Sequence, residues 1–166
     1  MPDRSLTFDE ALDRLNAAMG AFETAAEAIQ EIAASGSTLF EDAHALAEKR
    51  IDERDFGHLS VSLIQIWFAL VPRGGRAPRL RLDAMQAAIV QDAKKIQARG
   101  PGGMAVLQRM FSDSPQPNLL QAVAGALVKS YEEAPQPVRP QPGSVVVMVL
   151  VLKAMIAEID CALRRP

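Results

Sequence analysis

The chain has 166 residues, of which 49% are hydrophobic and 23% charged, and its formal net charge is −2. This composition is typical of a globular domain and excludes a disordered chain. The near balance of charge excludes a global basic field, so any contact with nucleic acid or an anionic membrane has to be local. One cysteine excludes an internal disulfide. Because the polar N-terminus has no signal-peptide pattern, we expect a cytoplasmic protein without a membrane partner.

The first predicted helix covers residues 8–33. Thr7 and Glu10 have the spacing of a capping box at its start. Apolar residues then follow at heptad spacing: Phe8, Leu12, Leu15, Met19, Phe22, Ala26, Ile29 and Ala33. A third apolar column contains Ala11, Ala18, Ala25 and Ile32. Three columns predict a bundle helix that packs against more than one neighbour.

The other side of this helix is acidic. It carries Asp9, Glu10, Asp13, Glu23, Glu27 and Glu31, with Arg14 as the only basic residue. We expect a solvated face, and the alternative is a docking surface for a basic partner.

A second helix is predicted over 39–55, with Thr38 and Glu41 as another capping box and a break at 56–58. Residues 59–71 (LSVSLIQIWFALV) follow and are closed by Pro72. A helix of this sequence is apolar on almost every side, so we expect a buried central helix that the others surround. The start of the segment also alternates with period two, which leaves a buried strand as the alternative.

The remaining helices are predicted over 82–100, 104–111, 119–133 and 144–165, with Asp83 and Asn118 as caps. Gly125 suggests a close approach of helices, and the prolines of 135–143 predict an extended linker. The Val-rich run 145–152 also favours a strand, but its apolar residues keep helical periodicity through to Leu163. The sequence therefore predicts an all-α, single-domain bundle of about six or seven helices.

The search for catalytic chemistry assigns no catalytic residue, cofactor or metal site. No phosphate-binding loop or nucleophile elbow is present. The pairs Glu41/His44 and Asp55/His58 have the spacing of half a di-iron site, but surface histidines near helix ends explain them better. Cys161 has acidic neighbours, which disfavour a thiolate nucleophile. A helix-turn-helix over 83–111 offers too few polar residues to reach base edges.

One local feature is a candidate binding site. Arg73, Arg76, Arg79 and Arg81 flank a Gly-Gly turn in the loop 73–81. Arginine presents a planar fork to phosphates and carboxylates, and glycine exposes backbone N–H groups. The alternative is an ordinary solvated loop.

We therefore predict a non-enzymatic protein–protein interaction protein of the adaptor, inhibitor or chaperone type. Abundant Ala and a preference for Arg over Lys suggest a bacterial or phage gene. The alternative is nucleic-acid or anionic-ligand binding through the loop 73–81. An enzyme with a pocket that lacks a motif is a third hypothesis, and a homo-oligomer is left open.

Overall fold

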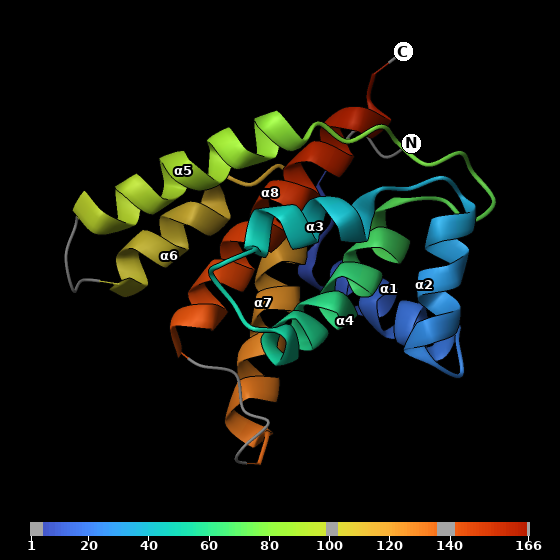
Figure 1. Ribbon diagram of the computed structural model, residues 1–166, viewed down its shortest axis with the longest axis horizontal. Coiled ribbons are helices and arrows are strands. Elements are labelled where there is room, and N and C mark those ends of the chain that lie inside the picture. Colours follow the sequence, from blue (N-terminus) through green and yellow to red (C-terminus); the bar gives the residue numbers. More distant parts are fainter. Residues whose placement is uncertain (1–4, 99–102, 136–141, 166) are drawn as a thin grey trace.

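A computed structural model describes residues 5–98, 103–135 and 142–165, and within those ranges it contains helices and no strand (Figure 1). The helices are α1 (Phe8–Gly20), α2 (Ala25–Ala34), α3 (Leu39–Ala47), α4 (Glu53–Leu70), α5 (Leu82–Ala98), α6 (Gly103–Ser112), α7 (Pro117–Glu133) and α8 (Pro142–Leu163). They form one compact all-α domain, as predicted. The strand alternatives for 59–71 and 145–152 are wrong. The described residues hold eight helices rather than six or seven, because the first predicted helix is divided.

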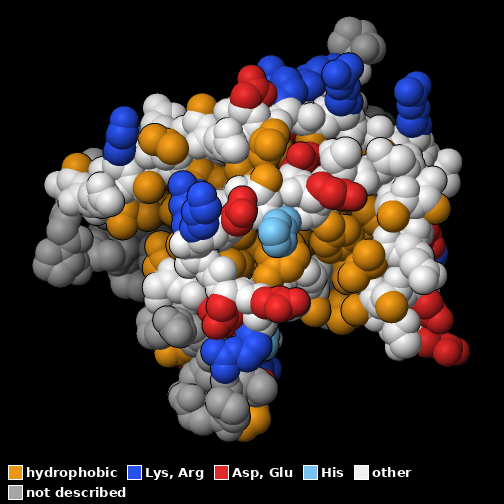
Figure 2. Space-filling view, viewed as in Figure 1, with side chains coloured by type: hydrophobic (Ala, Val, Ile, Leu, Met, Phe, Trp, Pro, Cys, Tyr) orange, Lys and Arg blue, Asp and Glu red, His pale blue; other side chains and the backbone are white. Residues whose placement is uncertain are grey.

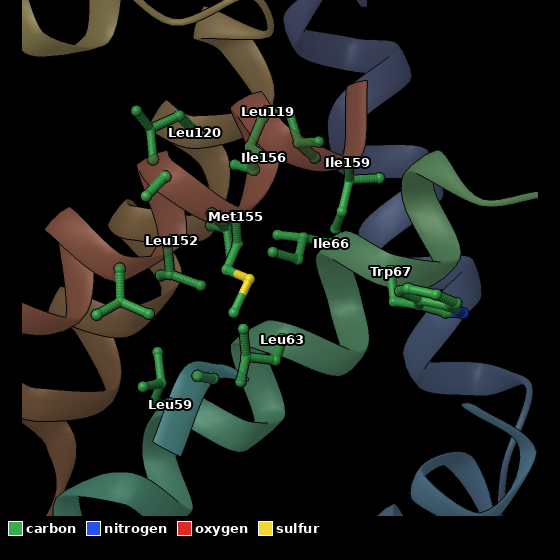
Figure 3. Packing of buried hydrophobic residues seen from close by; sticks show 14 of the residues in the cluster. Leu59, Leu63, Ile66, Trp67, Leu119, Leu120, Leu152, Met155, Ile156 and Ile159 are labelled. Carbon is green, nitrogen blue, oxygen red and sulfur yellow. The ribbon is translucent and has the colours of Figure 1, made fainter. Parts of the chain in front are cut away.

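The core lies between α4 and α8. Helix α4 contacts α1, α2, α3, α7 and α8, and α8 contacts α3, α4, α5 and α7. Figure 3 shows Leu63 and Ile66 of α4 pointing toward Met155 of α8. All three side chains are fully buried. Burial is therefore shared by two helices, and the expectation of a single central helix is not confirmed. In the described part of the chain, no helix combines the length and apolarity that a membrane span requires.

The predicted helix 8–33 is wrong as a single element, because the chain turns between α1 and α2. Thr24 caps α2: the Glu27 N–H donates to its hydroxyl oxygen at 3.3 Å, and Glu27 Oε2 accepts from the Thr24 N–H at 3.4 Å. Helix α1 ends at Gly20, and the capping box of Thr24 and Glu27 begins a new helix. The first box, of Thr7 and Glu10, is confirmed.

The turn also changes which residues of α1 are buried. Ala11 and Ala18 of the third apolar column are buried together with Leu15. Phe8, Leu12 and Met19 of the predicted stripe are instead 41%, 38% and 48% exposed. The predicted burial of these three is therefore wrong, and α1 keeps an apolar strip on its surface.

The predicted helix 39–55 ends early, at Ala47. Lys49 has a φ of 67°, a left-handed conformation that a continuous helix cannot contain. Asp52 then caps α4 by accepting from the Asp55 N–H at 2.8 Å. The predicted break at 56–58 is wrong, because these residues lie inside α4. The predicted capping box of Thr38 is also wrong, since its hydroxyl donates to Asp42 instead.

At the start of α7, the N-cap is Gln116 rather than the predicted Asn118, because Pro117 takes the first helical position. Asn118 Nδ2 instead donates to the Leu6 carbonyl at 2.8 Å, while the Leu6 N–H donates to Gln116 Oε1 at 2.9 Å. Both bonds fasten the N-terminal segment to α7. Asp83, predicted as the cap of the fourth helix, lies inside the first turn of α5.

Two further predictions concern Gly125 and the proline linker. Across the described ranges, a Cβ added at Gly125 would meet nothing within 4 Å, so the predicted close helix approach is wrong. The predicted linker 135–143 overlaps α8, which begins at Pro142, and its central residues 136–141 lie outside the described residues.

Candidate anion-binding edge

The loop between α4 and α5 turns at its two glycines. Gly74 has a φ of 73°, in the left-handed region that favours glycine. The Gly75 N–H donates to the Pro72 carbonyl oxygen at 3.2 Å, and an added Cβ at Gly75 would lie 3.2 Å from the same oxygen. The sequence Gly-Gly therefore reverses the chain, and residues 76–81 run without helix to the start of α5.

Arg73 lies on the α2 side of this turn and is fully engaged. Its Nε and an Nη donate to the two carboxylate oxygens of Glu31 at 3.1 and 2.7 Å. Its guanidinium also lies 5.0 Å from the ring centre of Phe22 and 5.8 Å from that of Phe68. The hydrogen bond from Arg73 lowers the pKa of Glu31. Arg73 therefore fastens the loop to α2 and α4, although its side chain stays 56% exposed.

Arg81 lies at the other end of the loop and is also engaged. Its Nε donates to Glu158 Oε1 at 3.0 Å and its backbone N–H to the same oxygen at 3.2 Å. Arg165 donates to this oxygen at 2.8 Å. Glu158 is only 5% exposed. Burial raises the pKa of Glu158, but the hydrogen bonds from Arg81 and Arg165 outweigh burial and leave the pKa below its usual value.

Arg76 and Arg79 differ from the other two loop arginines. Both are exposed, and within the described residues neither has a hydrogen bond, an ion pair or an aromatic contact. Arg79 is two residues from Arg81, so their Cα atoms lie within about 7 Å of each other along the chain. The four predicted site residues thus separate into two anchored and two free arginines.

The residues that follow α8 bring Arg165 to the same place, with Arg164 next to it in the chain. Arg165 shares Glu158 with Arg81, and Arg164 donates to Asp160 at 2.8 Å. Figure 2 shows Lys and Arg side chains gathered along the upper rim of the molecule, over the loop that enters α5 and the end of α8. We call this surface the arginine edge; it consists of Arg76, Arg79, Arg81, Arg164 and Arg165.

Sequence reasoning missed the contribution of Arg164 and Arg165. Two arginines at the C-terminal end of a helix are usually explained by the helix dipole. Their place beside the loop depends on the contact between α5 and α8, which joins segments that are 77 residues apart. No spacing in the sequence encodes that contact.

The geometry of the edge suits a ligand with carboxylate or phosphate groups. Arg81 and Arg165 are held on a buried carboxylate, so they keep a fixed position and lose little conformational freedom on binding. Arg76 and Arg79 still have both sides of their forks to offer. Arg81, Arg164 and Arg165 pair with two carboxylates, Glu158 and Asp160. Arg76 and Arg79 add two further positive charges, so the edge is positive.

The residues considered for catalysis are dispersed. Within the described ranges, no group of three or more His, Cys, Asp or Glu side chains could hold a metal ion. His44 stacks edge-on against Phe56, with 5.3 Å between ring centres. Cys161 is exposed, and Arg165 donates to its Sγ at 3.4 Å. Asp55 is 1% exposed, and among the described residues neither of its carboxylate oxygens has a hydrogen-bond partner.

Comparison with protein-family models, with curated proteins and with solved structures finds no match to this chain.

Proposed function

We propose that this chain is a non-enzymatic protein-interaction protein that binds an acidic segment of a partner through the arginine edge. One observation carries the proposal: Arg76 and Arg79 are exposed without a partner in the described residues, next to arginines fixed by the buried Glu158. The guanidinium groups of Arg76 and Arg79 can donate to a carboxylate, and the fixed arginines beside them set where that carboxylate lies.

Nucleic acid is the second candidate for the same edge. The edge holds five of the 18 basic residues, while the whole chain has a net charge of −2, so the rest of the molecule is strongly acidic. A long polyanion that extends beyond the edge is therefore repelled, whereas a short acidic segment is not. This charge distribution favours a protein partner.

We also propose a cellular location and an origin for the protein. A cytoplasmic adaptor, inhibitor or chaperone of bacterial or phage origin is supported by the single cysteine and by the small number of lysines, five in the whole chain.

The test is a titration of the full chain into a labelled Glu-rich peptide, followed by fluorescence anisotropy. We expect Arg76→Gln/Arg79→Gln to weaken binding by about tenfold or more, since two charge-assisted contacts are removed. Added salt should also weaken binding by the wild type. The matched control is Lys49→Gln/Lys94→Gln, which removes two exposed charges elsewhere and gives the same net charge.

Equal losses in the two double variants would overturn the proposal, because binding would then follow net charge and not the edge. A parallel titration with oligo-dT tests the second candidate. If the oligonucleotide binds more tightly than the peptide and loses affinity in the Arg76/Arg79 variant, the edge is a nucleic-acid site instead.

A further inference from the structure

Helix α1 carries three exposed large apolar side chains, Phe8, Leu12 and Met19. At 100° per residue, Phe8, Leu12 and Met19 fall within an arc of about 40°, so they form one line along the helix. Met19 also borders a hollow of about 120 Å³ with Val61 of α4, and Val61 is 37% exposed. We call these four residues the α1 strip. Its length on α1 is about 16 Å, enough for three turns of a second helix.

Carboxylates lie along this strip. Asp9 and Asp13 follow Phe8 and Leu12 on the solvent side of α1, and Glu23 lines the hollow beside Met19. Within the described residues, these three side chains have no ion pair. The segment 5–35 has six acidic residues and one arginine, and that arginine, Arg14, donates to the Ala69 carbonyl oxygen. The strip is therefore apolar along its centre, with carboxylates on its solvent side and beside Met19.

We infer that the α1 strip binds an amphipathic helix of a partner protein that carries apolar residues on one side and Lys or Arg beside them. The apolar side of such a helix covers the strip, and its cations face Asp9, Asp13 and Glu23. A second copy of this chain is a poorer occupant. In an antiparallel pair of α1 strips, the carboxylates of both copies would lie on the same side of the interface, and like charges in an interface are destabilising.

This inference goes beyond the proposed function and does not depend on it. The arginine edge takes an acidic segment, and the α1 strip takes a basic helix. The two surfaces have opposite charge, share no residue and can fail separately.

The experiment uses the full chain, labelled with ¹⁵N, and two synthetic helices with the same leucine face. One has lysine at every polar position and the other has glutamate. We expect the Leu/Lys peptide to bind and to shift the amide signals of α1 and of Val61. Leu12→Gln/Met19→Gln should weaken binding about tenfold, because it removes the centre of the apolar contact. Both side chains are exposed, so the variant should melt near the wild-type temperature.

Matched control variants distinguish binding at the α1 strip from non-specific binding elsewhere on the surface. Val90→Gln/Val128→Gln changes two valines that are 45% and 40% exposed elsewhere, and it should leave the affinity within about twofold. Asp9→Asn/Asp13→Asn should weaken binding and reduce its salt dependence, whereas Glu48→Gln/Glu53→Gln should not.

Three results would overturn the inference. The Leu/Glu peptide could bind as well as the Leu/Lys peptide, the Leu12/Met19 variant could keep its affinity, or the shifts could fall outside the strip. Sedimentation of the free chain tests the remaining occupant: a dimer that Leu12→Gln/Met19→Gln dissociates would assign the strip to a second copy.

Discussion

Arg81 and Glu158 are 77 residues apart in the chain, yet a guanidinium and a backbone N–H of the first donate to the carboxylate of the second at 3.0–3.3 Å. This contact joins the start of α5 to the end of α8. Arg165 donates to the same carboxylate, so Arg81 and Arg165 lie side by side in the arginine edge. The ion pair is thus structural, whereas Arg76 and Arg79 of the same loop have no partner within the described residues.

Loss of the buried carboxylate should destabilise the fold. Glu158→Gln keeps the shape of the side chain but leaves Arg81 and Arg165 without an anion, so we expect a loss of about 1–3 kcal/mol in the free energy of unfolding. Urea denaturation measures it. Arg81→Gln should also lower the melting temperature, whereas Arg79→Gln, which removes a free arginine two residues away, should leave it unchanged. If all three variants melt at the wild-type temperature, Glu158 has no structural role.

The same carboxylate should give a pH dependence of known sign. The pKa of folded Glu158 lies below its ordinary value of 4.5. Between the folded and unfolded pKa values the unfolded chain binds more protons, so stability rises with pH in that window. The contribution is therefore complete above about pH 4.5 and is lost as the pH falls through the folded pKa. The stability difference between wild type and Glu158→Gln should shrink below pH 4.5, and a difference that grows in acid would contradict the lowered pKa.

Trp67 should be essential to the core. It is buried on α4 beside Ile66, so truncation to alanine should cost about 3–5 kcal/mol, the range for a large core aromatic. Val61→Ala, on the exposed side of the same helix, should cost less than about 1 kcal/mol. Denaturant unfolding monitored by circular dichroism gives both values. A loss below about 1 kcal/mol for Trp67→Ala would mean that the packing around α4 differs from that described.

Two aspartates at the start of α4 should respond in opposite directions. Asp55 is buried, and neither carboxylate oxygen has a hydrogen-bond partner in the described part of the chain. Asp55→Leu should therefore raise the melting temperature by removing a desolvated polar group. Asp52 caps the helix from an exposed position, so Asp52→Ala should lower it. Calorimetry of the two variants measures both melting temperatures. Destabilisation by Asp55→Leu would show that this carboxylate has a partner in solution.

Local sequence chemistry predicted much of the fold. The helical period of α8 outweighed the strand preference of its valines, and the Thr7 box marked the start of α1. The division of α1 from α2 was also readable, since Thr24 and Glu27 have capping-box spacing. It was missed because the heptad spacing of apolar residues continues through the turn. Periodicity reports which residues are apolar and does not show whether the backbone between them is continuous.

The candidate site was predicted only in part. The loop 73–81 was found from its composition, but its four arginines looked equivalent. Arg73 is bound by Glu31 and Arg81 by Glu158, both from distant helices. Such pairings depend on tertiary packing, which no local pattern encodes. The exposure of Phe8 and Leu12 was unpredictable for the same reason, since the orientation of α1 is set by its contacts with α4 and α7.

The most direct test of the arginine edge is an NMR titration that follows the Nε–Hε signals of individual arginines while the Glu-rich peptide is added to the full chain. We predict that the signals of Arg76 and Arg79 shift with the binding curve, while the signal of Arg73, held by Glu31 and two phenylalanines, stays in place. Binding that leaves Arg76 and Arg79 unshifted, or that moves Arg73 first, would contradict it.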